Sequence, residues 1–283
     1  MRNKAANKDF TINNLPYNRR QQFSDVLKHR FNVLIKCGLM LLLFVLPILI
    51  CIFFKDISTL NLMNSGEENQ DVIFSIMFTT DTIYRLIMIP CLFVFSIGLS
   101  GVIRVLRNLI FSEPIFFKDD FKDGIKNSIK PMLVISILIG LVSLLGGVLN
   151  NLISVGYLSV IPQAFNYLVI YPVCFIAFFL TSIYKNSFSI NVRTSFAIYI
   201  KHLPKILLSY GLFVIIVLCQ FVPVFIFIIK YLLILLLIVF YMPISLFGSY
   251  LYQVSLYDKY INIDQFPNYY LKGLYHAKNE NKE

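Results

Sequence analysis

Long apolar stretches alternate with polar segments along this chain, and six of the stretches are long enough to cross a bilayer. A transmembrane helix needs about 20 apolar residues. The six stretches are 37–54, 86–103, 132–150, 164–184, 206–229 and 231–257. The pattern predicts an all-α integral membrane protein, with six transmembrane helices inside a domain at 23–257. A mobile tail at 1–22 and a second tail at 258–283 are expected on either side of it.

Only Lys230 separates the fifth stretch from the sixth, so the sequence allows a second interpretation. Residues 206–257 could form one long helix, which would leave five spans. About 50 residues of continuous helix would be far longer than a bilayer is thick, so six spans are favoured. The turn at Lys230 must then be tight.

The basic residues are distributed unevenly between the segments that join the stretches. All but three of the 25 Lys and Arg lie in the segments 1–36, 104–131, 185–205 and 258–283, and the three exceptions are Lys55, Arg85 and Lys230. Lys and Arg collect on the cytoplasmic side of a membrane. Both termini are therefore expected inside, with the acidic loop 55–85 and the short loop 151–163 outside.

The composition agrees with a membrane location. Hydrophobic residues make up 58% of the chain and charged residues only 14%, although the net charge is +10. A nucleic-acid-binding protein gathers its basic residues on one soluble face. Here they flank apolar stretches, which favours anionic lipid headgroups as partners and argues against nucleic acid.

Two of the basic segments share an amphipathic pattern, with apolar and basic residues in adjacent stripes at helical spacing. The first segment combines Phe117, Phe121, Ile125 and Ile129 with Lys118, Lys122, Lys126 and Lys130; the second combines Val192, Phe196 and Ile200 with Arg193, Lys201 and Lys205. A fainter version has Phe23, Leu27, Phe31 and Ile35. The pattern predicts interfacial helices whose basic residues face lipid headgroups or a protein partner.

These helices suggest three units, each made of an interfacial helix followed by a helical hairpin. Units inserted in the same sense would be related by an axis along the membrane normal. The alternative is that any basic amphipathic segment before a span has this pattern.

Few polar residues lie within the predicted spans, and no Asp, Glu, Lys or Arg lies in the middle of one. Their absence argues against proton or ion coupling. Five spans contain a proline, which can kink a helix and free a carbonyl, although packing kinks are the commoner outcome. The candidates for a kink or a polar lining are Pro90, Pro172, Pro223, Asn166 and Gln220.

No catalytic, metal-binding or cofactor-binding pattern is found in the sequence. The five cysteines lie inside apolar stretches without a CxxC pair, and the three histidines are scattered. Motifs such as GxxxxGK[ST], HExxH and GxSxG are absent. We therefore expect a protein that is not an enzyme and holds no cofactor.

Three stretches resemble the YesL family of bacterial membrane proteins, a domain of unknown function. They are SEPIFFKDDFKDGIK at 112–126, IKHLPK at 200–205, and YDKYIN at 257–262 followed by QFP at 265–267 and GL at 273–274. The last differs from the family pattern in having Tyr257 where Phe is usual. The long polar N-terminus and the acidic segment 55–85 also depart from the family.

This resemblance implies a multi-pass protein of the bacterial cytoplasmic membrane without catalytic residues. Some members are encoded beside sugar-uptake ABC transporters, which implies an accessory or scaffold subunit linked to carbohydrate uptake, with a transporter subunit as partner. The alternative is a facilitator or channel for a neutral small solute. A protein that organises lipids is a third hypothesis.

Overall fold

The computed structural model describes residues 16–66, 69–153, 158, 160–184, 186–218 and 227–275, and this part of the chain contains helices and turns without a strand. The α-helices are α1 (Arg19–His29), α2 (Phe31–Asn64), α3 (Gln70–Ile110), α4 (Phe117–Leu152), α5 (Ile161–Phe165), α6 (Tyr171–Ile183), α7 (Phe188–Lys201), α8 (Leu203–Leu218), α9 (Phe227–Leu236) and α10 (Met242–Tyr257). The π-helical turns are η3 (Asn166–Ile170), η6 (Leu237–Tyr241) and η7 (Asp258–Asn262), and η8 (Pro267–Tyr269) is a 3-10 turn.

Five helical runs are long and apolar enough to cross a membrane: α2, α3, α4, Ile161–Ile183 and Ile228–Asn262. The chain is thus an all-α, multi-pass membrane protein. Of the predicted span 206–229, the structure describes α8 as far as Leu218, and Gln220 and Pro223 lie outside the described residues. The hydroxyl of Ser249 in α10 donates to the Ser209 carbonyl in α8 at 3.1 Å. One helix over 206–257 would hold these residues about 60 Å apart, so the single long helix of the five-span alternative is wrong. The sixth span stays a prediction, because five helical runs qualify among the described residues.

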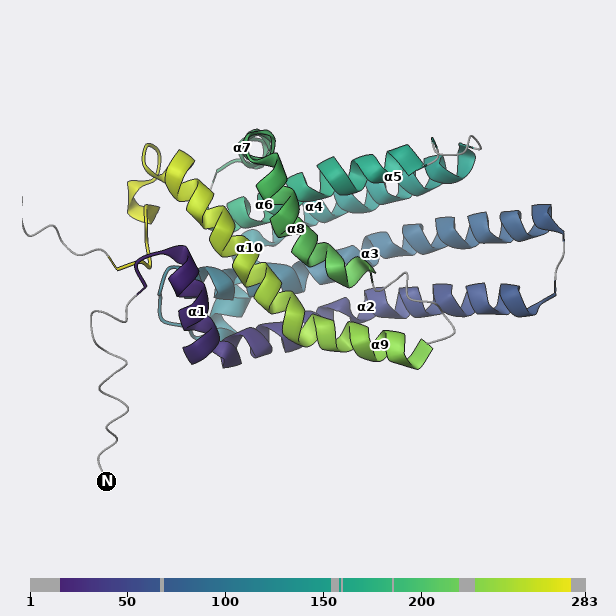
Figure 1. Cartoon of the computed structure of the whole chain (residues 1–283), viewed down its shortest axis with the longest axis horizontal. Coiled ribbons are helices and arrows are strands. Elements are labelled where there is room, and N and C mark those ends of the chain that lie inside the picture. The colour runs from purple at the N-terminus through teal and green to yellow at the C-terminus, as the bar shows by residue number, and fades with distance from the viewer. Residues whose placement is uncertain are drawn as a thin grey trace, which may run out of the picture.

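The expected outer loop at 55–85 is wrong, because helix continues through most of it (Figure 1). α2 has 34 residues and α3 has 41, which gives lengths of about 50 and 60 Å. Both exceed the hydrocarbon core of a bilayer, about 30 Å. One of the acidic residues that suggested a loop is paired between the helices: the Asp81 carboxylate lies 2.6 Å from the Lys55 ammonium on the facing helix. We call this end of the molecule, with the α2–α3 turn, the hairpin end.

The opposite end carries α1, α7, the start of α4 and residues 258–275, and we call it the basic end (Figure 1). α7 is a short separate helix that precedes α8, as the amphipathic pattern predicted. α1 is also short and separate, but it contains only Phe23 and Leu27 of the fainter pattern, because Phe31 and Ile35 lie in α2. The third amphipathic segment differs, since α4 continues through Pro131 without a break. The three-unit repeat stays a prediction, with one of its interfacial helices fused to the next span.

The middle of the bundle is filled by aromatic side chains from α6 and α10. The ring of Phe179 stacks on Tyr250 with centroids 4.5 Å apart, and Phe175 meets Phe179 edge to face at 4.8 Å. α6 is buried along its length from Cys174 to Leu180. Protein interiors are packed as densely as organic crystals, and these aromatic contacts are typical of such a core.

Candidate functional site

A buried network of charged and polar groups closes the basic end. Arg19 of α1 donates to the carboxylate of Asp258 at 2.8 Å, and both side chains are buried. The same guanidinium donates to the Lys272 carbonyl at 2.9 Å. The other Asp258 oxygen accepts from Asn262 at 2.8 Å and from the Leu271 backbone N–H at 3.2 Å. The carboxylate therefore accepts hydrogen bonds at both oxygens, which compensates its buried charge.

The last described residues lie against the end of α3. The Lys272 ammonium pairs with Glu113 at 2.6 Å, and the Gln22 amide donates to the Ile110 carbonyl at 2.6 Å. Gly273 has a φ of +86°, and a Cβ there would overlap the Ile110 carbonyl oxygen. Glycine is therefore the only residue that fits this position without strain.

Residues of the stretches that resemble the YesL family meet at this end. Glu113 belongs to the first stretch, and Asp258, Asn262 and Gly273 belong to the last. The ammonium of Lys201, in the middle stretch, lies 4.0 Å from the ring centre of Tyr260, a cation–π contact. The structure thus brings together residues that are up to about 160 positions apart in sequence.

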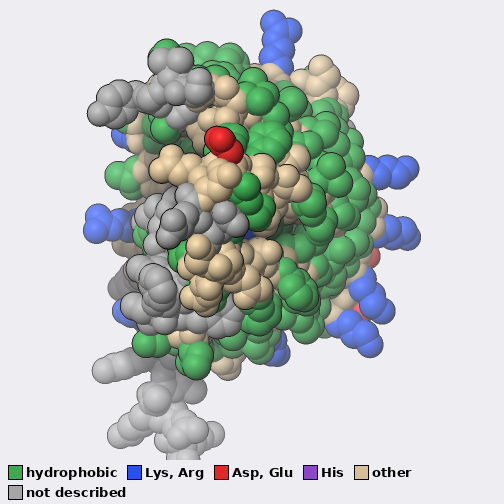
Figure 2. All heavy atoms as spheres, turned by 90° about the vertical axis from the view of Figure 1, so that its right-hand side faces the viewer, with side chains coloured by type: hydrophobic (Ala, Val, Ile, Leu, Met, Phe, Trp, Pro, Cys, Tyr) green, Lys and Arg blue, Asp and Glu red, His purple; other side chains and the backbone are tan. Residues whose placement is uncertain are grey.

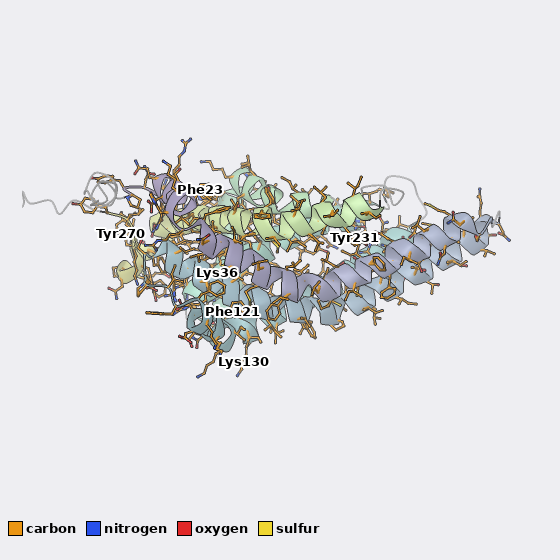
Figure 3. The ribbon with its side chains drawn as sticks, turned by 90° about the horizontal axis from the view of Figure 1, so that it is seen from below. Phe23, Lys36, Phe121, Lys130, Tyr231 and Tyr270 are labelled. Carbon is orange, nitrogen blue, oxygen red and sulfur yellow. The ribbon has the colours of Figure 1, made fainter. Side chains whose placement is uncertain are left out.

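The basic candidates Lys118, Lys122, Lys126, Lys130, Arg193, Lys201 and Lys205 are all exposed at the basic end. Figure 3 places Lys130 at the same end as Phe121, Phe23 and Tyr270, and away from Tyr231. The structure places these basic residues on three helices: four on α4, two on α7, and Lys205 in the first turn of α8. Their role in facing lipid or a partner stays a prediction.

The apolar stripes beside these basic residues behave differently on the two helices. Phe121 of α4 is 7% exposed, and its ring lies where a Cβ on Gly101 would be. The expectation that this stripe lies free at the membrane interface is wrong, because a glycine on α3 lets the helix dock there. On α7, Phe196 is 49% exposed and Ile200 is 61% exposed. Only the α7 stripe remains open to lipid or to a partner.

The candidate kink and polar residues do not converge on one site. Pro90 is exposed on α3, whereas Pro172 is buried at the start of α6, just after the π turn η3. The Asn166 amide donates to the Val142 carbonyl at 3.0 Å, which ties η3 to α4. Pro223 and Gln220 lie outside the described residues.

A second charged network lies toward the hairpin end, and the sequence reasoning missed it. Asp81 of α3 pairs with Lys55 of α2 and with Arg85, both at 2.6 Å. Arg85 also donates to the Ser143 carbonyl of α4 at 3.1 Å, so the network joins three helices. The i, i+4 spacing of Asp81 and Arg85 was the available signal.

Lys230 belongs to the same region. Its side chain is 1% exposed and its ammonium lies 2.6 Å from the Asp56 carboxylate. The Tyr231 hydroxyl donates to the same oxygen at 3.0 Å. The expectation that Lys230 marks a tight turn is wrong, since it lies inside α9, where the ion pair compensates its charge.

A polar cleft of about 320 Å³ opens beside this network. Its lining is mixed: polar side chains come from Lys55, Thr59, Asp81, Arg85, Asn150 and Asn151, and apolar ones from Leu62, Phe74, Ile76, Met77 and Phe78. Figure 2 looks onto this end: hydrophobic side chains cover much of the described surface, and polar groups and an acidic side chain lie nearer its centre. The Lys and Arg side chains that project past the outline belong mostly to the basic end behind. The cleft could accept a small hydrogen-bonding solute.

Among the described residues, no group of three or more His, Cys, Asp and Glu is placed to hold a metal ion. No protein-family model, curated protein or solved structure matches the chain. The relationship to the YesL family therefore stays a prediction from the three stretches.

Proposed function

We propose that this multi-pass protein is a non-enzymatic accessory or scaffold subunit of a transporter in a bacterial cytoplasmic membrane. The observation that carries the proposal is the open apolar and basic surface of α7. Phe196 and Ile200 are exposed there beside Lys201, and the exposed Lys205 follows in the first turn of α8. An apolar patch rimmed by charges is typical of a protein or membrane contact.

The framework behind α7 suits a docking role. Lys201 and His202 both lie against Tyr260, whose neighbours Asp258 and Asn262 belong to the buried network with Arg19. A docking surface that is fixed to a rigid network loses little conformational entropy on binding. Through these contacts, partner binding at α7 would affect Arg19, near the start of the described chain, and Asp258, near its end.

The filled middle of the bundle favours this role over conduction by the chain alone. Phe175, Phe179 and Tyr250 stack across the space between α6 and α10. A conducting path would have to displace these rings. The link to carbohydrate uptake and to an ABC-type transporter rests on the family resemblance.

A pull-down from native membranes in mild detergent tests the proposal. The wild type should retain a permease or solute-binding protein in stoichiometric amount. The variant Lys126→Ala/Lys130→Ala/Lys201→Ala/Lys205→Ala should lose this partner and solute uptake. The matched control is Lys118→Ala/Lys122→Ala, which removes exposed lysines from the first turns of α4 only. A well-expressed wild type that carries no partner would contradict the proposal.

A second candidate is a facilitator for a neutral solute, favoured by the polar cleft with Asn150 and Asn151. It predicts solute flux into liposomes that contain this protein alone. Flux should fall in the Asn166→Ala and Gln220→Ala variants if these side chains line the path. Absence of flux together with a stable partner complex would reject the facilitator and support the scaffold.

The threading of the chain is part of the proposal. We expect the basic end inside and the hairpin end outside, because Lys and Arg favour the cytoplasmic side. In a cysteine-free background, Asn64→Cys should react with a membrane-impermeant thiol reagent applied to intact cells. Lys118→Cys should react only after the membrane is opened. The reverse result would invert the orientation.

A further inference from the structure

A cavity of about 680 Å³ lies at the basic end, where α3, α4, α6 and the start of α7 come together. The side chains that define its chemistry are Arg104, Arg107, Lys130, Asn127, Asn186 and Asn191. Its volume is within the usual range of small-molecule sites, about 300–1,000 Å³. It lies apart from the exposed α7 stripe and from the polar cleft at the hairpin end.

The described lining of this cavity is cationic. Arg104, Arg107 and Lys130 contribute to it, and no Asp or Glu is found among the described residues that line it. Arg107 is 9% exposed. The Nε atoms of Arg104 and Arg107 are buried and have no hydrogen-bond partner in the described part of the chain.

The Nε atom of Arg19 is also buried without a partner, so the feature that sets Arg104 and Arg107 apart is the lack of an ion pair. Arg19 pairs with Asp258 at 2.8 Å, and Arg85 pairs with Asp81 at 2.6 Å. Neither Arg104 nor Arg107 forms an ion pair with a carboxylate of the described residues. The guanidinium of Arg107 instead lies near the rings of Phe111 and Tyr269, at 5.3 and 5.9 Å from their centres.

Guanidinium groups that line a cavity without an ion-pair partner favour the binding of an anion. Arginine remains charged inside proteins, so burial cannot remove its charge by deprotonation. A buried charge without a partner is costly unless an opposite charge compensates it. Aromatic rings supply part of this compensation but no acceptor for a guanidinium N–H.

The start of α7 adds to the attraction for an anion. Phe188 and Asn191, in the first turn of this 14-residue helix, line the cavity. Ser187, the residue that caps the helix, makes no side-chain hydrogen bond to it. Unpaired N–H groups and the positive end of the helix dipole both favour an anion here. Arginine pairs give phosphate oxygens a planar, two-pronged contact.

We propose that this cavity binds the phosphate group of a polyol phosphate ester. Arg104 and Arg107 would hold the phosphate, and Lys130 would contribute charge from the exposed rim. The cavity is larger than phosphate alone needs, and the Asn127 and Asn186 amides offer donors and acceptors for hydroxyl groups. This chemistry is shared by the phosphoglycerol headgroup of an anionic lipid and by a soluble polyol phosphate. The inference does not depend on the scaffold role.

Binding to the full chain, purified in detergent and stripped of lipid, tests the inference. The probes are glycerol phosphate, dioctanoyl phosphatidylglycerol and, as a zwitterionic control, dioctanoyl phosphatidylcholine, followed by calorimetry and native mass spectrometry. One molecule of an anionic probe should bind per chain. Binding of both anionic probes would point to a soluble ester as the source, and binding of the lipid alone would point to a headgroup; either result supports the site.

The variants locate the site. Arg104→Gln and Arg107→Gln should each weaken binding of the anionic probe by at least about tenfold, the scale of a lost hydrogen bond to a charged group. Lys130→Gln should weaken it less. Lys126→Gln, one turn earlier on α4 and outside the cavity, is the matched control and should bind as the wild type does. If Arg107→Gln fails to fold, the binding test relies on Arg104→Gln alone. Failure of every anionic probe to bind, or equal binding by the wild type and Arg104→Gln, would overturn the inference.

Discussion

The Arg19 guanidinium and the Asp258 carboxylate lie 2.8 Å apart in the folded protein, although 239 positions separate them in the sequence. Both side chains are buried. The pair joins the first described helix to the end of the last one. Around it, the Gln22 amide and the Lys272 carbonyl complete the network. The basic end is thus closed by contacts between the two terminal regions of the described chain.

Removing one partner of this ion pair should destabilise the protein strongly. Asp258→Asn leaves the Arg19 charge buried without a counter-charge, a change that costs about 3–5 kcal/mol. The free energy of unfolding, measured in mixed micelles with a chemical denaturant, should fall by this amount. Arg20→Gln is the control, because Arg20 is exposed on the same helix. The double variant Arg19→Met/Asp258→Leu should be less destabilised than the sum of its single variants Arg19→Met and Asp258→Leu. Simple additivity of the two would contradict the pairing.

Gly273 should tolerate substitution less well than Gly66. Both have positive φ angles, +86° and +68°, so alanine at either position adopts a left-handed backbone at about 1–2 kcal/mol. At Gly273 the new Cβ also overlaps the Ile110 carbonyl, whereas at Gly66 it meets nothing within 4 Å. Gly273→Ala should therefore lower the midpoint of thermal unfolding more than Gly66→Ala does. Equal shifts would mean that residues 271–275 do not pack on α3 as the structure has them.

The Lys230–Asp56 pair should fix α9 against α2. Asp56→Asn leaves the almost fully buried Lys230 ammonium with a neutral partner, and it should destabilise the protein by several kcal/mol. Lys230→Met/Asp56→Leu removes both charges and should be closer to the wild type. Thermal unfolding of the three proteins in the same detergent gives the comparison. Lys36→Gln, at an exposed position near the start of α2, is the control for a simple change of net charge.

The sequence predicted the helices well where local pattern determines them. Runs of about 20 apolar residues are explained only by a membrane or a large core, so the centres of α2, α3 and α4 follow directly. The sequence did not predict where α2 ends and where α3 begins. Lys55, Asp81 and Arg85 look like loop residues in a one-dimensional scan, because each charge is judged without its partner. In the fold, Asp81 pairs with Lys55 on the facing helix and with Arg85 on its own helix. These tertiary contacts compensate the charges and allow the helices to continue.

The candidate site shows the same limit. Phe121 and Phe196 occupy equivalent places in the amphipathic pattern, yet one is buried and the other is half exposed. The difference comes from Gly101 on α3, which gives the Phe121 ring room to dock. Such a contact depends on a residue outside the segment. The same reason kept Arg104 and Arg107 out of the predicted site, since only the fold brings them beside α7.

His202 should make the stability of the basic end depend on pH. Burial, reinforced by the charges of Lys201, Lys205 and Lys259, holds its pKa below the ordinary value of 6.5. Its Nε2 atom is buried without a hydrogen-bond partner in the described part of the chain, and its ring lies 5.0 Å from that of Tyr260. Protonation in the folded state is therefore disfavoured.

The sign follows from proton binding. Between the lowered pKa and 6.5 the unfolded chain binds more protons than the folded chain, so stability rises with pH in this window. Above about pH 6.5 the histidine is neutral in both states and its contribution is constant. Thermal unfolding followed from about pH 8 down to about pH 5 should show a fall that His202→Gln reduces. Lys205→Gln should reduce it partly, because losing a nearby cation moves the pKa of His202 back toward its ordinary value. An undiminished slope in His202→Gln would assign the pH dependence to other groups.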